Sequence, residues 1–380
     1  MSMDETPCEL APLKPAPDIQ KFLISASCHL GGRLDTPNIL IADATPGLRN
    51  RATHQRLRSA ENARTVFTLV FRTNPDDQGG VIIPQYDWVA EQVCGYLSLF
   101  YGKRFDSHGA IENSGLFYLP DLRALDLFCD PRLPQNGNAP RSDFGHPFEL
   151  ERFEVMLPLM FAAPARDTRM VPFRTAMKFY QQALWAAEHD LEIAYLHLIS
   201  AGEILTGSLE LDEASMIDAQ TRALLARVEA EMHDGVKTAR IVRSKVLGIK
   251  RRFVVGLESL LNPAFFEQSQ ATHGFARLEA KTIAKRLGAA YDLRSRYVHT
   301  GQSFGIVVGP RGMDREEVQP GKPMHDDKEF ARALACAPTY IGLERILRYC
   351  LLRYLETLGL NLVVREVAPD AGGRGGDSYR

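Results

Sequence analysis

The sequence predicts an α+β domain followed by an all-α helical bundle. Up to about residue 170 it contains short β-rich runs separated by Gly, Pro and Asn, a pattern typical of strands and turns. From Arg174 to about Gly359 it instead consists of long segments with helical character and few strand signals. We therefore expect domains at residues 1–170 and 171–362, followed by a Gly-rich disordered tail at 363–380.

The first domain is predicted to consist of short strands interrupted by one helix. The strand-like segments are KFLISASC, NILIADA, TVFTLVF and GLFYLP. The helix has Pro84 near its start and ends at Gly102, which is followed by Lys103. Its apolar stripe is expected to comprise Trp88, Val93, Leu97 and Phe100 or Tyr101. A polar loop rich in Pro, Gly and Asn follows at 129–147.

The bundle begins with the segments RTAMKFYQQALWAAEHD and LEIAYLHLISAGEILTG. The second is apolar almost all round, which predicts a buried helix. A long polar segment starts at Leu211, and a further helix, FARLEAKTIAKRLGAAYDL, follows it. That helix carries one stripe of small and apolar residues at Ala276, Ala280, Ile283, Leu287 and Ala290. After a Gly/Pro-rich loop at 301–325, Pro338 should break or kink the last helix.

Composition is that of an ordinary soluble globular protein, with 45% hydrophobic and 24% charged residues. The net charge of −2 creates no global attraction to nucleic acid, so any polyanion site must be a local patch. The six cysteines form no CxxC pair and are expected to be reduced thiols. We expect a cytoplasmic protein, because we find no signal peptide and no apolar stretch long enough for a bilayer. No motif indicates a metal or a cofactor.

A charged residue interrupts the apolar stripe of the helix that ends in YDLRSRYVHTG. The next stripe positions after Ala290 are 294 and 298, and they hold Arg and Val. The buried helix LEIAYLHLISAGEILTG carries a carboxylate, Glu203, close to its end. Because a buried charge needs a partner, we expect Glu203 and Arg294 to pair. Such a pair can be purely structural.

His299 follows Arg294 by five residues, which places the two side chains about 140° apart on an ideal helix. They could therefore share one site in only two ways. His299 could sit on a frayed or turning helix end before Gly301. Alternatively, two copies of the helix could meet across a two-fold axis, with each cleft taking Arg and His from both chains.

The residues RSRYVH match the R-x4-6-H motif of HEPN domains, and YDLRSRYVHTG resembles the Apea-like branch of that superfamily. AGEILTG is similar to the acidic first-helix position of the same branch, and the resemblance covers roughly residues 174–358. It implies a HEPN-like helical bundle, a homodimer and a metal-independent endoribonuclease. It further implies an RNA substrate and a role in bacterial antiviral defence or toxin-like growth arrest. In some HEPN toxins a Tyr close behind the His is the target of modification. In this chain His299 is followed by TGQSFG, which has no Tyr, so we do not expect that regulation.

The resemblance also assigns roles to individual residues. Arg294 and His299 would be catalytic, and Glu203 would orient Arg294. Ser295 and Tyr297 could add hydrogen bonds, although Tyr297 also fits a core position. A histidine can accept the proton of the 2′-OH or protonate the leaving 5′-oxygen. A guanidinium can hold the phosphate and stabilise the charge that develops on its oxygens. The expected products are a 2′,3′-cyclic phosphate and a 5′-OH.

A basic run, VKTARIVRSKVLGIKRR, is a candidate RNA backbone track. Its alternative is a solvated helix face. The same run contains all the candidate RNA-binding residues, namely Lys237, Arg240, Arg243, Lys245, Lys250, Arg251 and Arg252. A second possible ligand edge is FYGKRFDSHG, whose alternative is a charged turn leading into a strand.

Two other functions remain open besides the ribonuclease. One is a non-catalytic helical module that binds RNA or a protein partner. The other is a ligand-sensing dimer with its main pocket in residues 1–170, which would then sense or recruit an unknown trigger. The ribonuclease requires an accessible His299 within a few ångströms of Arg294, from its own chain or from a partner's.

Overall fold

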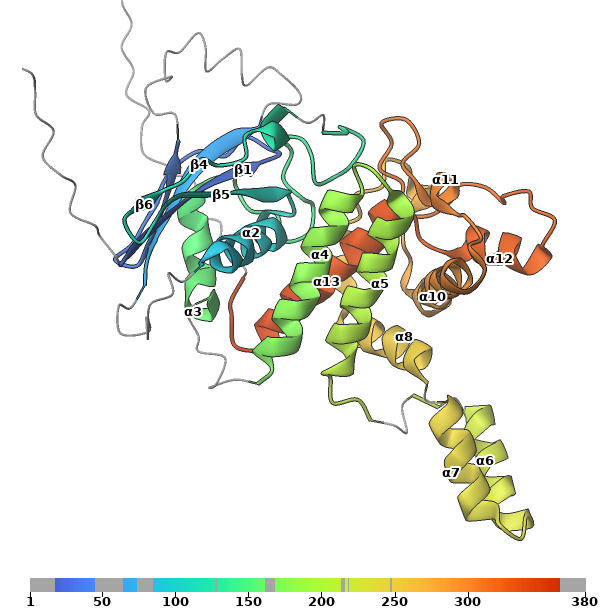
Figure 1. Cartoon of the computed structure of the whole chain (residues 1–380). Helices are drawn as coiled ribbons and strands as arrows, with labels where there is room; N and C mark the ends of the chain where they lie inside the picture. Colours follow the sequence, from blue (N-terminus) through green and yellow to red (C-terminus); the bar gives the residue numbers. More distant parts are fainter. Residues whose placement is uncertain are drawn as a thin grey trace, which may run out of the picture.

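The computed structural model describes residues 18–44, 64–73, 85–126, 129–160, 168–212, 216–217, 219–246 and 248–362. An antiparallel sheet region comes first in the chain and a helical part follows it, as expected (Figure 1). The predicted tail at 363–380 lies outside the described residues. In the described part of the chain, no helix is both long enough and apolar enough to cross a membrane.

The sheet has six strands in the order β2-β3-β4-β1-β5-β6, and all neighbours are antiparallel. On β4, Phe67, Leu69 and Phe71 are buried and alternate with partly exposed residues, so one face of the sheet packs on the core. The strands are β1 (Ile19–Ala26), β2 (Leu34–Asp35), β3 (Ile39–Asp43), β4 (Thr65–Arg72), β5 (Phe105–Asn113) and β6 (Leu116–Phe117).

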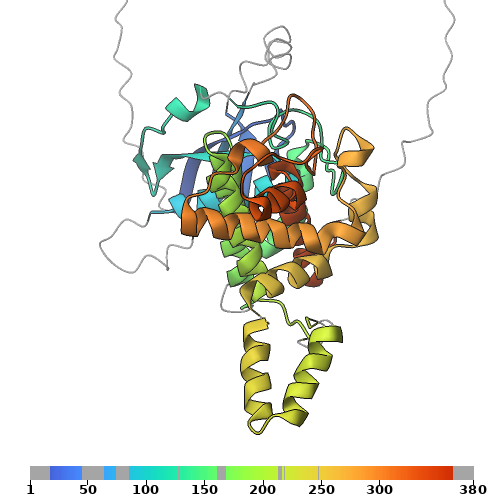
Figure 2. The same ribbon diagram turned by 90° about the vertical axis from the view of Figure 1, so that its right-hand side faces the viewer.

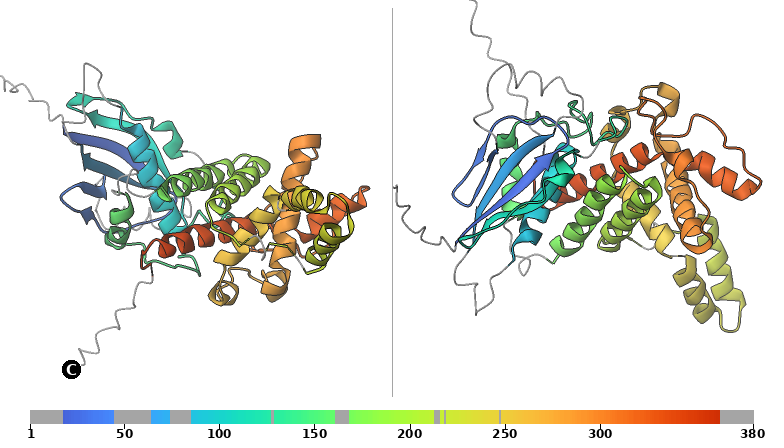
Figure 3. Two further views of the ribbon diagram at one scale, coloured as in Figure 1. Left: turned by 90° about the horizontal axis from the view of Figure 1, so that it is seen from below. Right: turned by 45° about the horizontal axis from the view of Figure 1, so that its top comes forward.

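Helix α2 (Asp87–Tyr101) lies between the sheet and the helical part (Figures 1 and 3). It ends where the sequence predicted, because Gly102 adopts a left-handed conformation with φ 62°. Trp88 departs from the expected buried stripe and is 62% exposed, while Val93 and Leu97 are buried. Three short elements complete this region: η3 (Arg123–Asp126), η4 (Leu150–Met156) and α3 (Leu157–Met160).

The helical part is built around α13, which is buried along most of its length and packs on α4, α5 and α8 (Figure 1). The longer helices are α4 (Met170–Ala186), α5 (Leu191–Gly207), α8 (Ile249–Leu260), α10 (Ile283–Thr300), α12 (Lys328–Cys336) and α13 (Tyr340–Thr357). Helices α9 (Pro263–Glu267) and α11 (Gly305–Val308) are short. The predicted break at Pro338 is confirmed, since it lies between α12 and α13.

Helices α6 (Ala219–Glu231) and α7 (Gly235–Val246) form a hairpin that extends away from the rest of the molecule (Figure 2). The hairpin has a small apolar cluster of its own, made by Ile217, Leu225 and Ala239 with Val228 against it. The part of the long polar segment that forms α6 and α7 is therefore an appendage, whereas its last helix, α8, packs inside the bundle.

A buried ionic network joins the loop at 129–147 to α13. Glu344 accepts hydrogen bonds from Arg141, at 2.5 and 3.0 Å, and from the Tyr180 hydroxyl at 2.6 Å. Arg348 donates to four backbone carbonyls, two at the end of α2 and two in the loop, over 2.7–3.1 Å. One hydrophobic core runs through both regions. The sequence changes from strand-like to helical patterns near residue 170, but the packing is continuous there.

Candidate functional site at the end of helix α10

Helix α10 begins later than its sequence pattern suggested. The expected stripe starts at Ala276, but that residue lies in a 3₁₀ turn, η5 (Gly274–Ala276), and a second turn, η6 (Ala280–Thr282), precedes α10. Tertiary hydrogen bonds explain the difference. The Ala276 carbonyl accepts from the backbone N–H groups of Glu317 and Val318, and the Leu278 N–H donates to the Glu317 carboxylate. These backbone groups are therefore not available for a helix.

The predicted pair between Glu203 and Arg294 forms, with 3.6 Å between Nη2 and Oε2. It joins α5 to α10, and the two side chains are 19% and 28% exposed. Tyr291 completes the group, with its ring 5.7 Å from the guanidinium carbon. Burial, together with the Glu203 carboxylate, raises the pKa of Tyr291 to about 12. Arg294 is thus held on two sides while part of its surface stays open to solvent.

A second carboxylate of α5, Glu192, holds the chain just beyond α10. Its Oε1 accepts hydrogen bonds from the Ser303 hydroxyl at 2.6 Å and from the backbone N–H groups of Phe304 and Gly305. Burial raises the pKa of Tyr297, and the negative charge of Glu192 adds to the effect. Glu192 and Glu203 therefore hold the two ends of α5 against the C-terminal half of the antiparallel helix α10 and the chain just beyond it. The sequence analysis attached no role to Glu192, because its partners lie more than 100 residues away.

Tyr297 packs against the core rather than facing an open site. Its ring meets Phe304 edge-on at 5.6 Å, and the side chain is partly buried against the main apolar cluster. Of the two positions that the sequence allowed for Tyr297, these contacts correspond to the core position.

His299 is exposed and lies in the last turn of a continuous helix. Helix α10 runs through Thr300 and ends at Gly301, where φ is 68° and the N–H donates to the Tyr297 carbonyl at 2.9 Å. The frayed end that would have turned His299 toward Arg294 is therefore not present. In a regular helix the two side chains point about 140° apart. Within the described residues, His299 has no hydrogen bond or ion pair.

Ser295 lies on the His299 face, since four residues correspond to about 40° of rotation. It lines a hollow of about 450 Å³ between α10 and α12, together with Asp292, Arg296, Glu329, Arg332 and Ala333. Arg296 is tied to α12 by ion pairs with Asp327 at 2.6 Å and Glu329 at 3.2 Å. One chain thus brings Arg294 and Glu203 together on one face and places Ser295 and His299 on another.

Most of the basic run takes part in internal contacts. Arg252 donates to the carbonyls of Thr206, Gly207 and Leu209 at the end of α5. The other contacts are Arg251 to the Met216 carbonyl at 2.6 Å, Lys250 to Asp292 at 2.6 Å and Arg243 to Glu229 at 3.2 Å. Lys237 and Arg240 are exposed on α7, and the side chain of Lys245 lies outside the described part. A continuous RNA track along this run stays a prediction, with two exposed cations to support it.

A groove that the sequence did not reveal lies between α2, β5 and α4. Its volume is about 540 Å³, and it contains both tryptophans of the chain, Trp88 and Trp185, which are 62% and 53% exposed. Arg104 and Asp106, from the second possible ligand edge, form an ion pair at its wall. The other lining residues are Glu91, Gln92, Ser107, Arg174, Thr175, Met177, Lys178, Gln181 and Gln182. The sequence gave no signal for this groove, because the exposure of the two tryptophans is seen only in the structure.

No family model, no curated protein and no solved structure matches this chain. The resemblance to HEPN domains therefore stays a prediction from the residues of α5 and α10. In the described part of the chain, the side chains around the end of α10 form no group with the spacing of metal ligands.

Proposed function

We propose that the protein is a metal-independent endoribonuclease of the HEPN type, whose active site forms only when two chains meet. The observation that carries the proposal is the placement of Arg294 and His299 on one rigid helix. Arg294 is anchored by Glu203 yet partly open, and His299 is exposed at the helix end. The two residues fit the motif by type and spacing, but their directions differ by about 140°. A two-fold pair of α10 helices removes this conflict, because each cleft takes one residue from each chain.

The exposed surface of α10 offers a contact for such a pair. Val298 continues the Arg294 stripe by one turn and is 54% exposed, whereas the sequence pattern placed it on a buried stripe. An exposed apolar side chain beside a partly open arginine suits a surface that a second copy covers.

The chemistry needs only groups that this site contains. RNA supplies the nucleophile, its 2′-OH, and the His299 imidazole of one chain accepts that proton. The Arg294 guanidinium of the other chain binds the phosphate and stabilises the charge that develops on its oxygens. The leaving 5′-oxygen takes a proton from water and the imidazolium of His299 returns its proton to water, which gives a 2′,3′-cyclic phosphate and a 5′-OH. Glu203 keeps Arg294 in position throughout.

The test compares the wild type with His299→Ala on total RNA in the presence of EDTA. We expect fragments ending in 2′,3′-cyclic phosphate from the wild type and a loss of at least about 100-fold in the variant, as for removal of a general acid–base. His233→Ala is the matched control, because that imidazole is fully exposed on the α6–α7 hairpin. Equal cleavage by His299→Ala would exclude His299 from the site. If purified protein is silent, growth arrest by expressed wild type and not by His299→Ala tests the same site.

A second candidate function is ligand sensing in the two-tryptophan groove. Indole rings stack on planar rings, and the exposed Lys178 offers an anion contact beside them. A nucleoside monophosphate is therefore a suitable probe. Because both tryptophans line the groove, their fluorescence reports occupancy directly. Saturable quenching that Lys178→Ala weakens would favour this function, and unchanged fluorescence up to millimolar probe would exclude this ligand class.

A further inference from the structure

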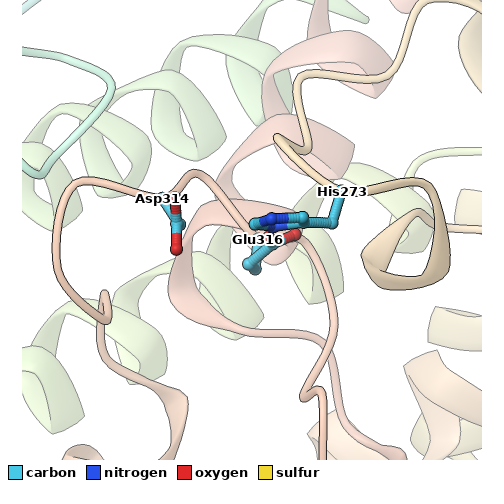
Figure 4. A group of neighbouring side chains, drawn as sticks. All are labelled: His273, Asp314 and Glu316. Atoms are coloured by element: carbon cyan, nitrogen blue, oxygen red, sulfur yellow. Dashed lines mark hydrogen bonds and ion pairs between the residues drawn. The ribbon is translucent and has the colours of Figure 1, made fainter.

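Three potential metal ligands converge on one surface spot that lies away from α10. His273, Asp314 and Glu316 each offer one ligand atom, and these atoms all lie within 4.8 Å of one another. Figure 4 shows the His273 ring over the Glu316 carboxylate, with the Asp314 carboxylate on the other side of Glu316. His273 lies 43 positions before Glu316 in the chain, whereas Asp314 and Glu316 are next-but-one neighbours. This separation is why no spacing motif predicted the group.

The backbone already holds these residues in register. The N–H groups of Glu317 and Val318 donate to the Ala276 carbonyl, each at 3.1 Å, and the Arg315 N–H donates to the Thr272 hydroxyl at 3.2 Å. The segment that carries Asp314 and Glu316 is thus joined to the segment that carries His273. Rigid backbone on both sides lowers the entropy that a ligand set loses when it binds an ion.

The start of α13 fixes the carboxylate segment from the opposite side. The Thr339 hydroxyl donates to the Glu316 carbonyl at 2.6 Å, and the Thr339 N–H donates to the Glu317 carbonyl at 3.0 Å. Gly342 permits this approach, since a Cβ there would lie 2.2 Å from the Glu317 carbonyl oxygen. The Glu317 carboxylate in turn accepts from Arg345 and the Gln270 N–H within the buried network. The backbone at Glu316 and Glu317 is therefore anchored to the folded core.

Glu316 has an unsatisfied oxygen in this rigid setting. Its side chain is 11% exposed, and in the described part of the chain its Oε2 is buried without a hydrogen-bond partner, while Oε1 contacts His273. A buried carboxylate oxygen without a donor is costly, and a bound cation would satisfy it. His273 stacks on Phe275 at 5.2 Å, which limits the rotation of its ring.

We propose that His273, Asp314 and Glu316 bind one divalent first-row metal ion, which clips the segment before α10 to the loop before α12. One imidazole and two carboxylates suit Zn²⁺, Co²⁺ or Mn²⁺ better than Ca²⁺, which takes oxygen ligands. With metal–ligand distances of about 2.1 Å, the donor atoms around a tetrahedral ion lie about 3.4 Å apart, so the most widely separated pair must move closer by up to about 1.4 Å. Water would complete the coordination, because the site opens to solvent. The metal has a structural role that is separate from the metal-independent cleavage proposed for α10.

The experiment titrates the untagged, metal-stripped full chain with Zn²⁺ by calorimetry and with Co²⁺ by absorption spectroscopy. We expect one ion per chain, and an increase of Tm when Zn²⁺ is present. Glu316→Gln should weaken binding at least about tenfold while keeping the side-chain shape, and His273→Ala should do the same. His233→Ala is the matched control, since it removes an exposed imidazole that also lies near a carboxylate, that of Asp234 at 3.8 Å.

Each result decides the proposal. Stoichiometric binding lost in Glu316→Gln and His273→Ala, and retained in His233→Ala, would support the site. No binding by the wild type at millimolar Zn²⁺ would overturn it, as would binding that neither variant changes. Circular dichroism of the metal-free variants confirms that they fold.

Discussion

Mixing two inactive variants should restore ribonuclease activity if the site takes Arg294 and His299 from different chains. Arg294→Ala and His299→Ala homodimers each lack one half of both sites. In a mixed dimer, one cleft loses both residues and the other keeps both. Random pairing at equal concentrations makes half of the dimers mixed, and each of these has one intact site out of two. The expected activity is therefore about a quarter of the wild-type value.

The structure distinguishes a site made by two chains from a site made within one chain, because one chain holds Arg294 and His299 apart. Arg294 and His299 are about 7.5 Å apart along α10 and about 140° apart around it, and the helix is regular to Thr300. If one chain supplied both groups, every mixed dimer would contain only defective sites, and activity would stay at the level of the single variants. A site shared by two chains therefore predicts about 25% of the wild-type activity in the mixture, whereas a site within one chain predicts no activity above that of the single variants.

The assay co-expresses the two variants with different tags, isolates the mixed dimers and measures fragments ending in 2′,3′-cyclic phosphate in EDTA. Because every isolated dimer is mixed and has one intact site of two, the expected activity rises from about a quarter to about half of the wild-type value. The matched control pairs Arg294→Ala with a chain that carries both substitutions, which can form no intact cleft. Restoration in the test pair and not in the control is the expected result. Inactive mixed dimers, from a wild type that cleaves, would refute the two-chain site.

Three further predictions concern the groups around this site and the core. Glu203→Gln removes the charge that holds Arg294, so cleavage should fall about tenfold while urea unfolding changes by less than about 1 kcal/mol, because the pair is partly exposed. Burial, with Arg348 and Arg152 nearby, lowers the pKa of His146 from 6.5 to about 3. Between these values the unfolded chain binds a proton that the folded chain rejects, so acidification from pH 6.5 to 4 costs about 3 kcal/mol of stability at this residue. His146→Phe, which keeps the stacking on Phe100, should remove that loss in urea titrations at the two pH values; an unchanged difference would contradict it. Arg348→Met leaves four buried carbonyls without their donor and should lower the free energy of unfolding by about 4 kcal/mol or more, whereas a change under about 1 kcal/mol would show that water replaces the guanidinium.

Local signals explain the parts of this structure that the sequence predicted. Gly102 and Gly301 end their helices in left-handed conformations, and Pro338 separates α12 from α13, because each residue acts on its own backbone. The pairing of Glu203 with Arg294 was also predictable, since two charges on apolar helix faces need each other.

Contacts between distant segments explain the parts that the sequence did not predict. The sequence predicted only a polar loop at 129–147, and it gave no sign that Arg141 and Asp143 are buried, which they are because α13 supplies their counter-charges. The late start of α10 follows from hydrogen bonds to Glu317, which is about 40 residues further on. Trp88 looked like a core residue by periodicity, but it lies at the edge of a groove. None of these partners can be identified by spacing within one segment.

The arrangement of α5 and α10 links activity to assembly. Glu203 and Glu192 hold the C-terminal half of α10 and the chain just beyond it against α5, so the helix cannot turn His299 toward Arg294 without breaking both sets of contacts. Under the proposed function, a single chain cannot complete the site, and a second chain is required. Under this proposal the folded monomer is a silent form of the enzyme, and any signal that promotes pairing of α10 helices would switch cleavage on. The rigidity that separates Arg294 from His299 in one chain would then place them accurately when two chains meet, because neither helix has to reorganise.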